Sequence, residues 1–113
     1  LNLIVNKIRN KKKLKIFNLD TKFNSVIDTK EIYKFIKFVL KNKFISGNYN
    51  FMANNPLKLI QILKILKKIN KSNSQIISSG RKNIQMISNL KIRKIFKFKI
   101  SPVKKIILRN LND

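Results

Sequence analysis

The chain is 113 residues long, a length that suits one small domain or one domain with tails. Its 27 lysines and arginines stand against 4 aspartates and glutamates, which gives a formal net charge of +23 at pH 7. The absence of His and Cys excludes an imidazole base, a thiol nucleophile and a Cys/His metal site. We therefore expect that the chain is not an enzyme and that it uses no cofactor.

The basic charge predicts a polyanionic partner. Apolar residues make up 43% of the chain, enough for a modest core, so a disordered basic tail is excluded. RNA, DNA and an anionic membrane surface are the candidate partners. No apolar run is long enough to span a bilayer, and we expect no signal peptide at the start of the sequence.

The first elements are a helix and a short strand. Leu1, Ile4, Val5 and Ile8 recur at helical spacing and predict a helix over residues 1–10, which a run of three lysines then ends. Next, Leu14 and Ile16 alternate with Lys15 and Phe17, which indicates a short strand. Residues 18–27 have the composition of a loop.

The clearest predicted element is a helix over residues 29–41. Asp28 is a good N-cap, and Glu31 completes a capping box with it. An apolar stripe follows at helical spacing, made of Ile32, Phe35, Ile36, Val39 and Leu40. The lysines opposite this stripe are either a solvated face or a row of phosphate contacts.

The later segments are more ambiguous. Asn55-Pro56 is typical of a helix start, and local spacing favours a helix after it, but residues 57–66 also suit a strand buried on both faces. We expect residues 70–83 to be a polar loop and residues 84–100 to be strand-like. Ser101-Pro102 interrupts that region, and a short segment, 103–108, follows.

Two basic motifs suggest contacts with phosphate. Gly80-Arg81-Lys82 could cradle a phosphate through its backbone N–H groups, or it could be a plain turn. Residues 94–99 alternate lysines with aromatic and aliphatic residues, a pattern that suits stacking on RNA bases and also suits a half-buried strand.

The residue choice indicates a genome rich in A and T. Lys, Ile, Asn and Phe, whose codons are built mainly from A and T, dominate the sequence, while Ala, Gly, Pro and Arg are rare. Such a bias is typical of organelles, so we expect a mitochondrial protein; an AT-rich nuclear or bacterial gene is the alternative. The four arginines, at 9, 81, 93 and 109, then indicate places where a planar guanidinium is needed.

Read in order, several segments resemble the eighth ribosomal protein of the small subunit, in its bacterial and mitochondrial form. The matching segments are Ile8-Arg9-Asn10, residues 40–47, residues 56–64 and the serine motif 84–88 with Arg93 beyond it. The resemblance implies that residues 57–64 are the third strand of that family. It covers the family's N-terminal domain and linker, so it implies that a separate chain completes the fold or that the role is mainly scaffolding.

A second resemblance competes with the first. Residues 96–102, with Arg109 eight positions after Ser101, are similar to the tenth ribosomal protein of the small subunit. That match requires a helix at 56–69 and leaves the first 40 residues unexplained, whereas the first resemblance explains them.

Together, these observations predict a small two-layer α+β domain in which two amphipathic helices pack on a short, mostly antiparallel sheet. Residues 1–69 would form the N-terminal α/β domain, 70–83 a polar loop insertion, and 84–113 the linker strands and a C-terminal tail. The expected RNA-binding residues are Arg9, Lys11, Lys12, Lys13, Arg81, Lys82, Ser88, Arg93, Lys97 and Lys99.

The predicted function is a structural constituent of a mitochondrial small ribosomal subunit, bound to ribosomal RNA through lysine-rich faces and to neighbouring ribosomal proteins. We expect no membrane and no small-molecule substrate as partners. The alternatives are the tenth ribosomal family and a basic protein that binds DNA or lies on a membrane, using residues 29–41.

Overall fold

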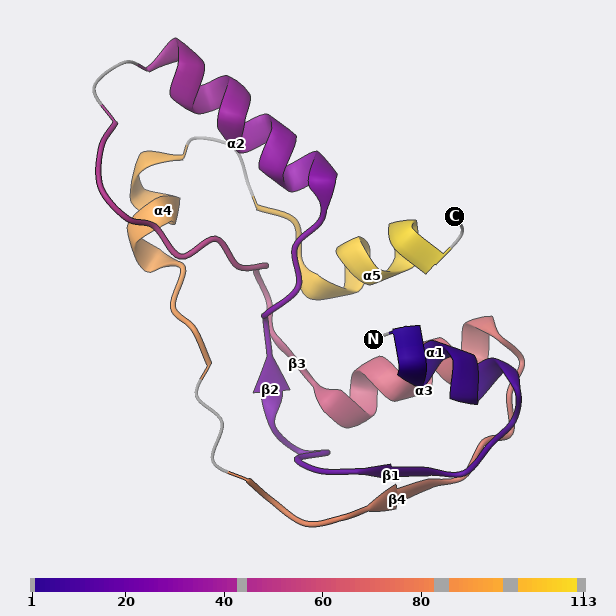
Figure 1. Ribbon diagram of the computed structural model, residues 1–113. Helices are drawn as coiled ribbons and strands as arrows, with labels where there is room; N and C mark the ends of the chain where they lie inside the picture. Colours follow the sequence, from indigo (N-terminus) through magenta and orange to yellow (C-terminus); the bar gives the residue numbers. More distant parts are fainter. Residues whose placement is uncertain (1, 43–44, 83–85, 97–99, 112–113) are drawn as a thin grey trace. The chain divides into compact units, whose positions relative to one another are not determined.

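The computed structural model describes residues 2–42, 45–82, 86–96 and 100–111 (Figure 1). The chain forms two compact units, and it enters each of them twice. Unit 1 contains Leu1–Lys22 and Leu57–Gln85, and unit 2 contains Phe23–Pro56 and Met86–Asp113. Helices and short strands both occur, which confirms the predicted α+β class.

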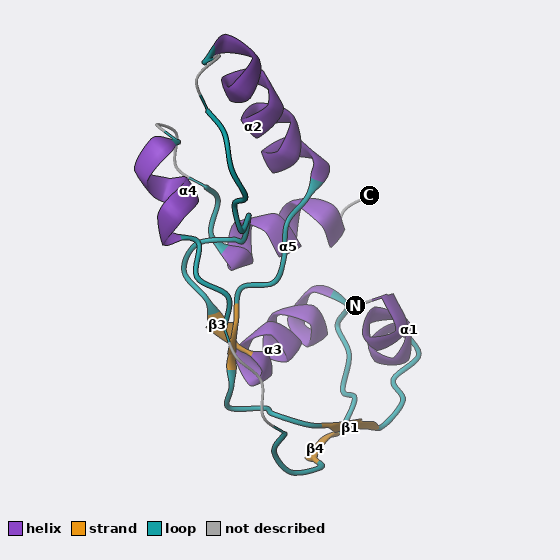
Figure 2. Ribbon diagram, turned by 60° about the vertical axis from the view of Figure 1, so that its left-hand side comes forward, coloured by secondary structure: helices purple, strands orange, loops and turns teal. Residues whose placement is uncertain are grey.

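Unit 1 uses a helix–turn–strand arrangement twice. Helix α1 (Asn2–Arg9) leads to strand β1 (Leu14–Ile16), and helix α3 (Leu59–Ile69) leads to strand β4 (Ile76–Ser78). The two helices contact each other, and so do the two strands (Figures 1 and 2). In both arrangements the helix comes before the strand. Strands β1 and β4 pair in parallel, with Leu14 opposite Ile76 and Ile16 opposite Ser78.

The prediction of a mostly antiparallel sheet was therefore wrong for this pair. An antiparallel pair can be closed by a tight turn, whereas parallel strands need a long crossover, which here includes α3. The predicted polar loop at 70–83 was wrong at β4, because Ile76 and Ile77 pair with a strand far away in the sequence. A shorter pairing joins β2 (Lys22–Phe23) to β3 (Leu57–Lys58).

Both helices of unit 1 end in the same turn. The N–H of Lys11, at φ +53°, donates to the carbonyl of Ile8 over 3.0 Å, and the N–H of Lys12 donates to Lys7 over 2.9 Å. At the end of α3, Lys71 has φ +46° and donates to Lys68, while Ser72 donates to Lys67. These left-handed residues satisfy carbonyls at the helix ends and turn the chain towards its strand.

Residues 59–69 form a helix, as local spacing favoured, so the strand that the family resemblance implied at 57–64 was wrong beyond Lys58. One face of α3 supplies Ile62, Leu63 and Leu66 to the core of unit 1, where Ile8 and Leu14 are also buried. A spacing of three and four residues places those α3 side chains on one side of a helix, whereas a strand would divide them between two faces.

Unit 2 contains three helices in the described residues, α2 (Thr29–Lys41), α4 (Leu90–Ile95) and α5 (Val103–Leu111). The expectation of linker strands over residues 84–100 was wrong at α4, and α5 forms where a short segment and a C-terminal tail were expected. Ile92 and Phe96 are one helical turn apart, and both are buried in one cluster with Ile100. The Phe96 ring lies 5.1 Å from Phe35 and 4.8 Å from Phe38, centroid to centroid, so aromatic packing joins α4 to α2.

Helix α2 begins where its cap predicts. The side chain of Asp28 accepts a hydrogen bond from the N–H of Glu31 over 3.1 Å. Glu31 does not return the bond that would complete the predicted capping box; its carboxylate is buried and contacts Ser101 and Arg109 instead. The predicted stripe is also only partly buried, because Ile32, Ile36 and Leu40 are exposed.

Candidate functional site

The predicted basic residues near the start of the chain lie at the adjoining C-terminal ends of α1 and α3. Arg9 Nε donates to Asn70 Oδ1 over 3.1 Å, and Ser72 Oγ donates to the carbonyl of Ile8 over 2.6 Å. The turn between α1 and β1 exposes Lys11, Lys12 and Lys13. We call this region the basic end of unit 1; it consists of Arg9, Lys11, Lys12, Lys13, Lys67, Lys68 and Lys71.

Lys67, Lys68 and Lys71 were missed as site residues, although the sequence carried a signal for them. They form a basic run at the end of an apolar helical stripe, where cations offset the partial negative charge of a helix C-terminus. No local pattern in the sequence predicts that this end of α3 lies beside the end of α1. The pairing turns two ordinary basic helix ends into one concentration of positive charge.

Arg81 and Lys82 lie on a loop that folds back on residues 17–20. The N–H of Lys82 donates to Asn18 Oδ1 over 2.6 Å, and its ammonium lies 4.1 Å from the centroid of the Phe17 ring. Arg81 is 83% exposed at its side chain and makes only a long contact of 4.0 Å with Asp20. The loop therefore exposes the guanidinium of Arg81 to solvent. The next residue, Lys82, is held by the Phe17 ring and by the side-chain amide of Asn18.

The remaining predicted site residues that the structure describes are Ser88 and Arg93, both in unit 2. Ser88 Oγ accepts from the N–H of Leu90, the first residue of α4, over 3.3 Å, while Asn89 stands at the N-cap position. Arg93 is exposed on α4, and among the described residues no carboxylate pairs with it. Lys97 and Lys99 lie outside the described residues.

The positive charge of Arg109, by contrast, is already paired with carboxylates of this chain. Its guanidinium makes a two-pronged contact with the Asp28 carboxylate, and its Nη2 lies 2.9 Å from Glu31 Oε1. Ser101 Oγ donates to the same Glu31 oxygen over 2.7 Å. This acid–arginine cluster holds α5 to the first turn of α2, which is a structural role.

The two acids of the cluster are held ionised. Burial alone would raise the pKa of Asp28, but hydrogen bonds from Arg109, Asn110 and the N–H of Glu31 outweigh it and lower the pKa to about 2. Burial likewise opposes ionisation of Glu31, and bonds from Ser101 and Arg109 overcome it, so its pKa also lies below its usual value. Both acids therefore stay negative at neutral pH and are unsuited to proton transfer.

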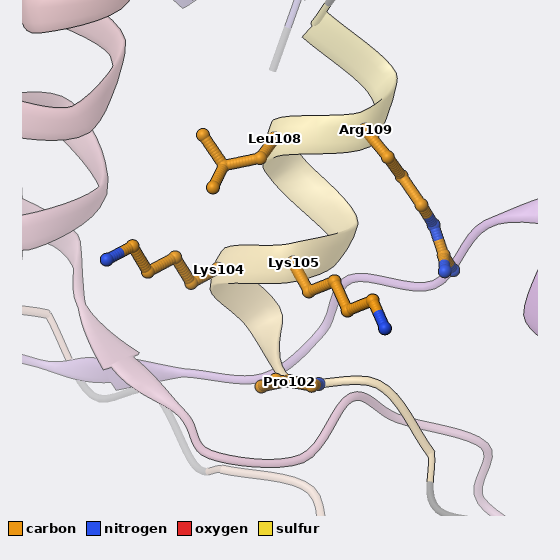
Figure 3. A pocket seen from close by; sticks show the side chains of 5 residues that line it. All are labelled: Pro102, Lys104, Lys105, Leu108 and Arg109. Atoms are coloured by element: carbon orange, nitrogen blue, oxygen red, sulfur yellow. The ribbon is translucent and has the colours of Figure 1, made fainter.

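A shallow depression of about 440 Å³ lies along α5, lined by Pro102, Lys104, Lys105, Leu108 and Arg109. In Figure 3, Lys104 and Leu108 extend from one side of the helix, and Lys105 and Arg109 from the other. Since Arg109 is already paired with Asp28 and Glu31, the two lysines are the groups here that could meet an anion.

Anion binding is the chemistry that these groups can perform. Within the described residues, no cluster of three or more Asp and Glu side chains could hold a metal ion. The helices of the described ranges include none with the length and apolar character needed to cross a membrane. Exposed lysines and arginines carry the positive charge and the hydrogen-bond donors that bind phosphate groups.

The sequence matches no protein-family model and no curated protein. The structure is similar to that of RMD from Pseudomonas aeruginosa, determined in complex with NADPH, with a TM-score of 0.67 and 16% sequence identity. The alignment covers 95% of this chain and 40% of the RMD chain. At this identity the similarity shows a shared fold, and this chain spans less than half of that protein's length.

Proposed function

We propose that this chain works as one part of a larger NADPH-binding protein with the architecture of RMD. The observation that carries the proposal is the shared fold over 95% of the chain, matched to only 40% of a protein seen with NADPH. The proposal rests on an analogy of fold, because the two sequences are only 16% identical.

The residues present define what this part could contribute. The chain has two glycines, Gly47 and Gly80, too few for a glycine-rich loop of the G-x-G-x-x-G kind that approaches a dinucleotide pyrophosphate. It also contains no His or Cys for proton transfer or nucleophilic attack. Binding of the dinucleotide through such a loop and the chemical step would then belong to the rest of the protein. This chain would supply structure and cationic contacts, among them the exposed guanidinium of Arg81.

The test is a native purification from the cells that produce the chain, followed by titration with NADPH observed through its fluorescence. We expect the native assembly to bind NADPH with one site per copy and the isolated 113-residue chain to bind none. An assembly that contains the chain and does not bind NADPH would overturn the proposal.

A second candidate function is favoured by a different observation, the basic end of unit 1. Seven cationic side chains there lie beside two helix C-termini, in a chain with a net charge of +23. Such a surface suits the phosphates of ribosomal RNA, as expected for a structural protein of a mitochondrial small ribosomal subunit. The resemblance to the eighth ribosomal protein supports this candidate, although its implied strand at 57–64 is a helix in α3.

The same native purification separates the two candidates. A ribosomal protein would sediment with the small subunit and would carry ribosomal RNA, and the exposed Arg93 would contact RNA in that particle. A part of an NADPH-binding protein would remain in the soluble fraction after nuclease treatment, with its partner intact.

A further inference from the structure

Helix α2 carries more apolar surface than the core of unit 2 covers. Phe35 and Phe38 pack against the cluster around Ile92 and Phe96. Another group of large apolar side chains on the same helix stays exposed: Ile32 at 40%, Tyr33 at 62%, Ile36 at 50% and Leu40 at 73%. We call these four residues the apolar face of α2.

Helical geometry shows that this face is separate from the other two sides of α2. Each residue advances about 100° around a helix, so the four side chains occupy an arc of about 100°. The inward side, with Phe35 and Phe38, lies next to one edge of that arc. The basic side lies beyond the other edge and contains Lys30, Lys34, Lys37 and Lys41.

We propose that the apolar face of α2 is a docking surface for another protein segment, one that presents apolar side chains bordered on one edge by carboxylates. This inference rests on the first proposed function, in which residues outside this chain complete the protein. Four exposed large apolar side chains on one side of a helix are typical of an interaction surface. Lys34 already pairs with Glu31, so Lys30, Lys37 and Lys41 along this edge supply the charge that carboxylates of the partner would complement.

A second copy of this chain is a poorer occupant. A symmetric pair would bring the same surface of two chains together, and each chain carries a net charge of +23. With the helices antiparallel the two lysine edges would approach each other, and in either orientation two chains of this charge would repel, with four acidic residues in each to offset them.

An anionic membrane is also a poorer occupant. A helix that lies on a lipid surface benefits from basic residues on both borders of its apolar side, where they reach the headgroups. On α2 the basic residues follow one border only, and the other border leads into the packed aromatic side. That arrangement suits a partner protein whose apolar side chains extend the core of unit 2 across α2.

Photo-crosslinking in the cells that produce the chain tests this surface. A benzophenone residue is introduced as Leu40→p-benzoylphenylalanine, with Lys30→p-benzoylphenylalanine on the basic side of the same helix as the matched control. We expect position 40 to crosslink at least fivefold more than position 30, to a peptide outside residues 1–113 that contains apolar residues and Asp or Glu. Adding Ile36→Lys, at a half-exposed position that the fold tolerates, should reduce the crosslink at position 40 at least fivefold.

Crosslinks to lipid, to RNA or to a second copy would overturn the docking proposal, as would equal yields at positions 40 and 30. The first proposed function fails separately. If the crosslinked protein is apolar and acidic but the assembly does not bind NADPH, the docking surface stands and the NADPH proposal falls.

Discussion

Arg109, in the last turn of α5, places its Nη2 2.9 Å from Oε1 of Glu31, 78 positions earlier in the sequence. The Glu31 side chain has no exposed surface, and that of Asp28, which binds the same guanidinium, is 9% exposed. Hydrogen bonds from Arg109 lower the pKa of both carboxyl groups and so help to keep them ionised despite their burial. Removing one partner of a buried ion pair typically costs about 3–5 kcal/mol, so the stability of unit 2 depends on this contact.

We expect Arg109→Lys to lower the free energy of unfolding by about 2 kcal/mol, because an ammonium cannot reproduce the two-pronged contact with Asp28 and also reach Glu31. Arg93→Lys is the matched control, and it should change stability by less than about 0.5 kcal/mol because Arg93 is exposed. Urea denaturation followed by circular dichroism measures both. Equal effects would mean that the acid–arginine cluster does not stabilise the fold.

The lowered pKa of Asp28 predicts a loss of stability in acid. The folded value is about 2, below the ordinary value near 3.8, so the folded protein binds this proton less readily than the unfolded chain does. The stabilisation, about 2 kcal/mol, is complete above pH 4 to 5 and disappears as the pH falls through 2. Unfolding free energies measured between pH 5 and pH 2 should show this slope, and Asp28→Asn should remove that part of it.

The acid–arginine cluster also shows what the sequence could and could not predict. Asp28 was recognised as an N-cap because that signal is local, involving a carboxylate and an N–H three residues away. Glu31 pairs with Lys34 three positions away, which is a local contact, but its buried partner Arg109 is 78 positions distant and no local pattern specifies it. Glu31 was assigned to a capping box because that rule reads only neighbouring positions.

Strand pairing and the site residues show the same difference between local signals, which the sequence reveals, and long-range contacts, which it does not. The helix at 59–69 was favoured by its own spacing, whereas β4 was missed because its pairing with β1 lies outside any local window. Arg9 and the lysines at 11–13 were predicted from their charge. Lys67, Lys68 and Lys71 were not, because they become part of the basic end only when α3 packs beside α1.

The basic end of unit 1 should dominate binding to RNA if the second candidate function is correct. The logarithm of the affinity for a structured RNA should fall linearly with the logarithm of the salt concentration, because each lysine bound to phosphate releases a counterion. Replacing Lys12 and Lys13 by Gln should reduce the slope by about 2. The same changes at Lys104 and Lys105 on α5 are the control, and a larger effect there would place the contact in unit 2.

Lys11 offers a test of the turn between α1 and β1. Its φ of +53° is costly for a residue with a side chain, by roughly 1 kcal/mol, and glycine adopts it freely. We therefore expect Lys11→Gly to raise the free energy of unfolding by about 1 kcal/mol, whereas Lys11→Ala removes the same charge without that gain. Thermal denaturation of the two variants separates backbone strain from charge, and identical melting temperatures would refute the assigned turn.

Each unit is built from two segments that are far apart in the sequence, and this limits when each unit can fold during synthesis. The first segment of unit 1 packs against residues 57–85. Helix α1 and strand β1 therefore lack their packing partners while the first segment of unit 2 is synthesised. Unit 2 in turn lacks Arg109 until its second segment, 86–113, is made, and until then Glu31 has no guanidinium beside it. A ribosome that stalled before residue 57 would therefore leave both units incomplete and open to chaperones, whereas one that stalled between residues 85 and 109 would leave unit 2 alone without its arginine.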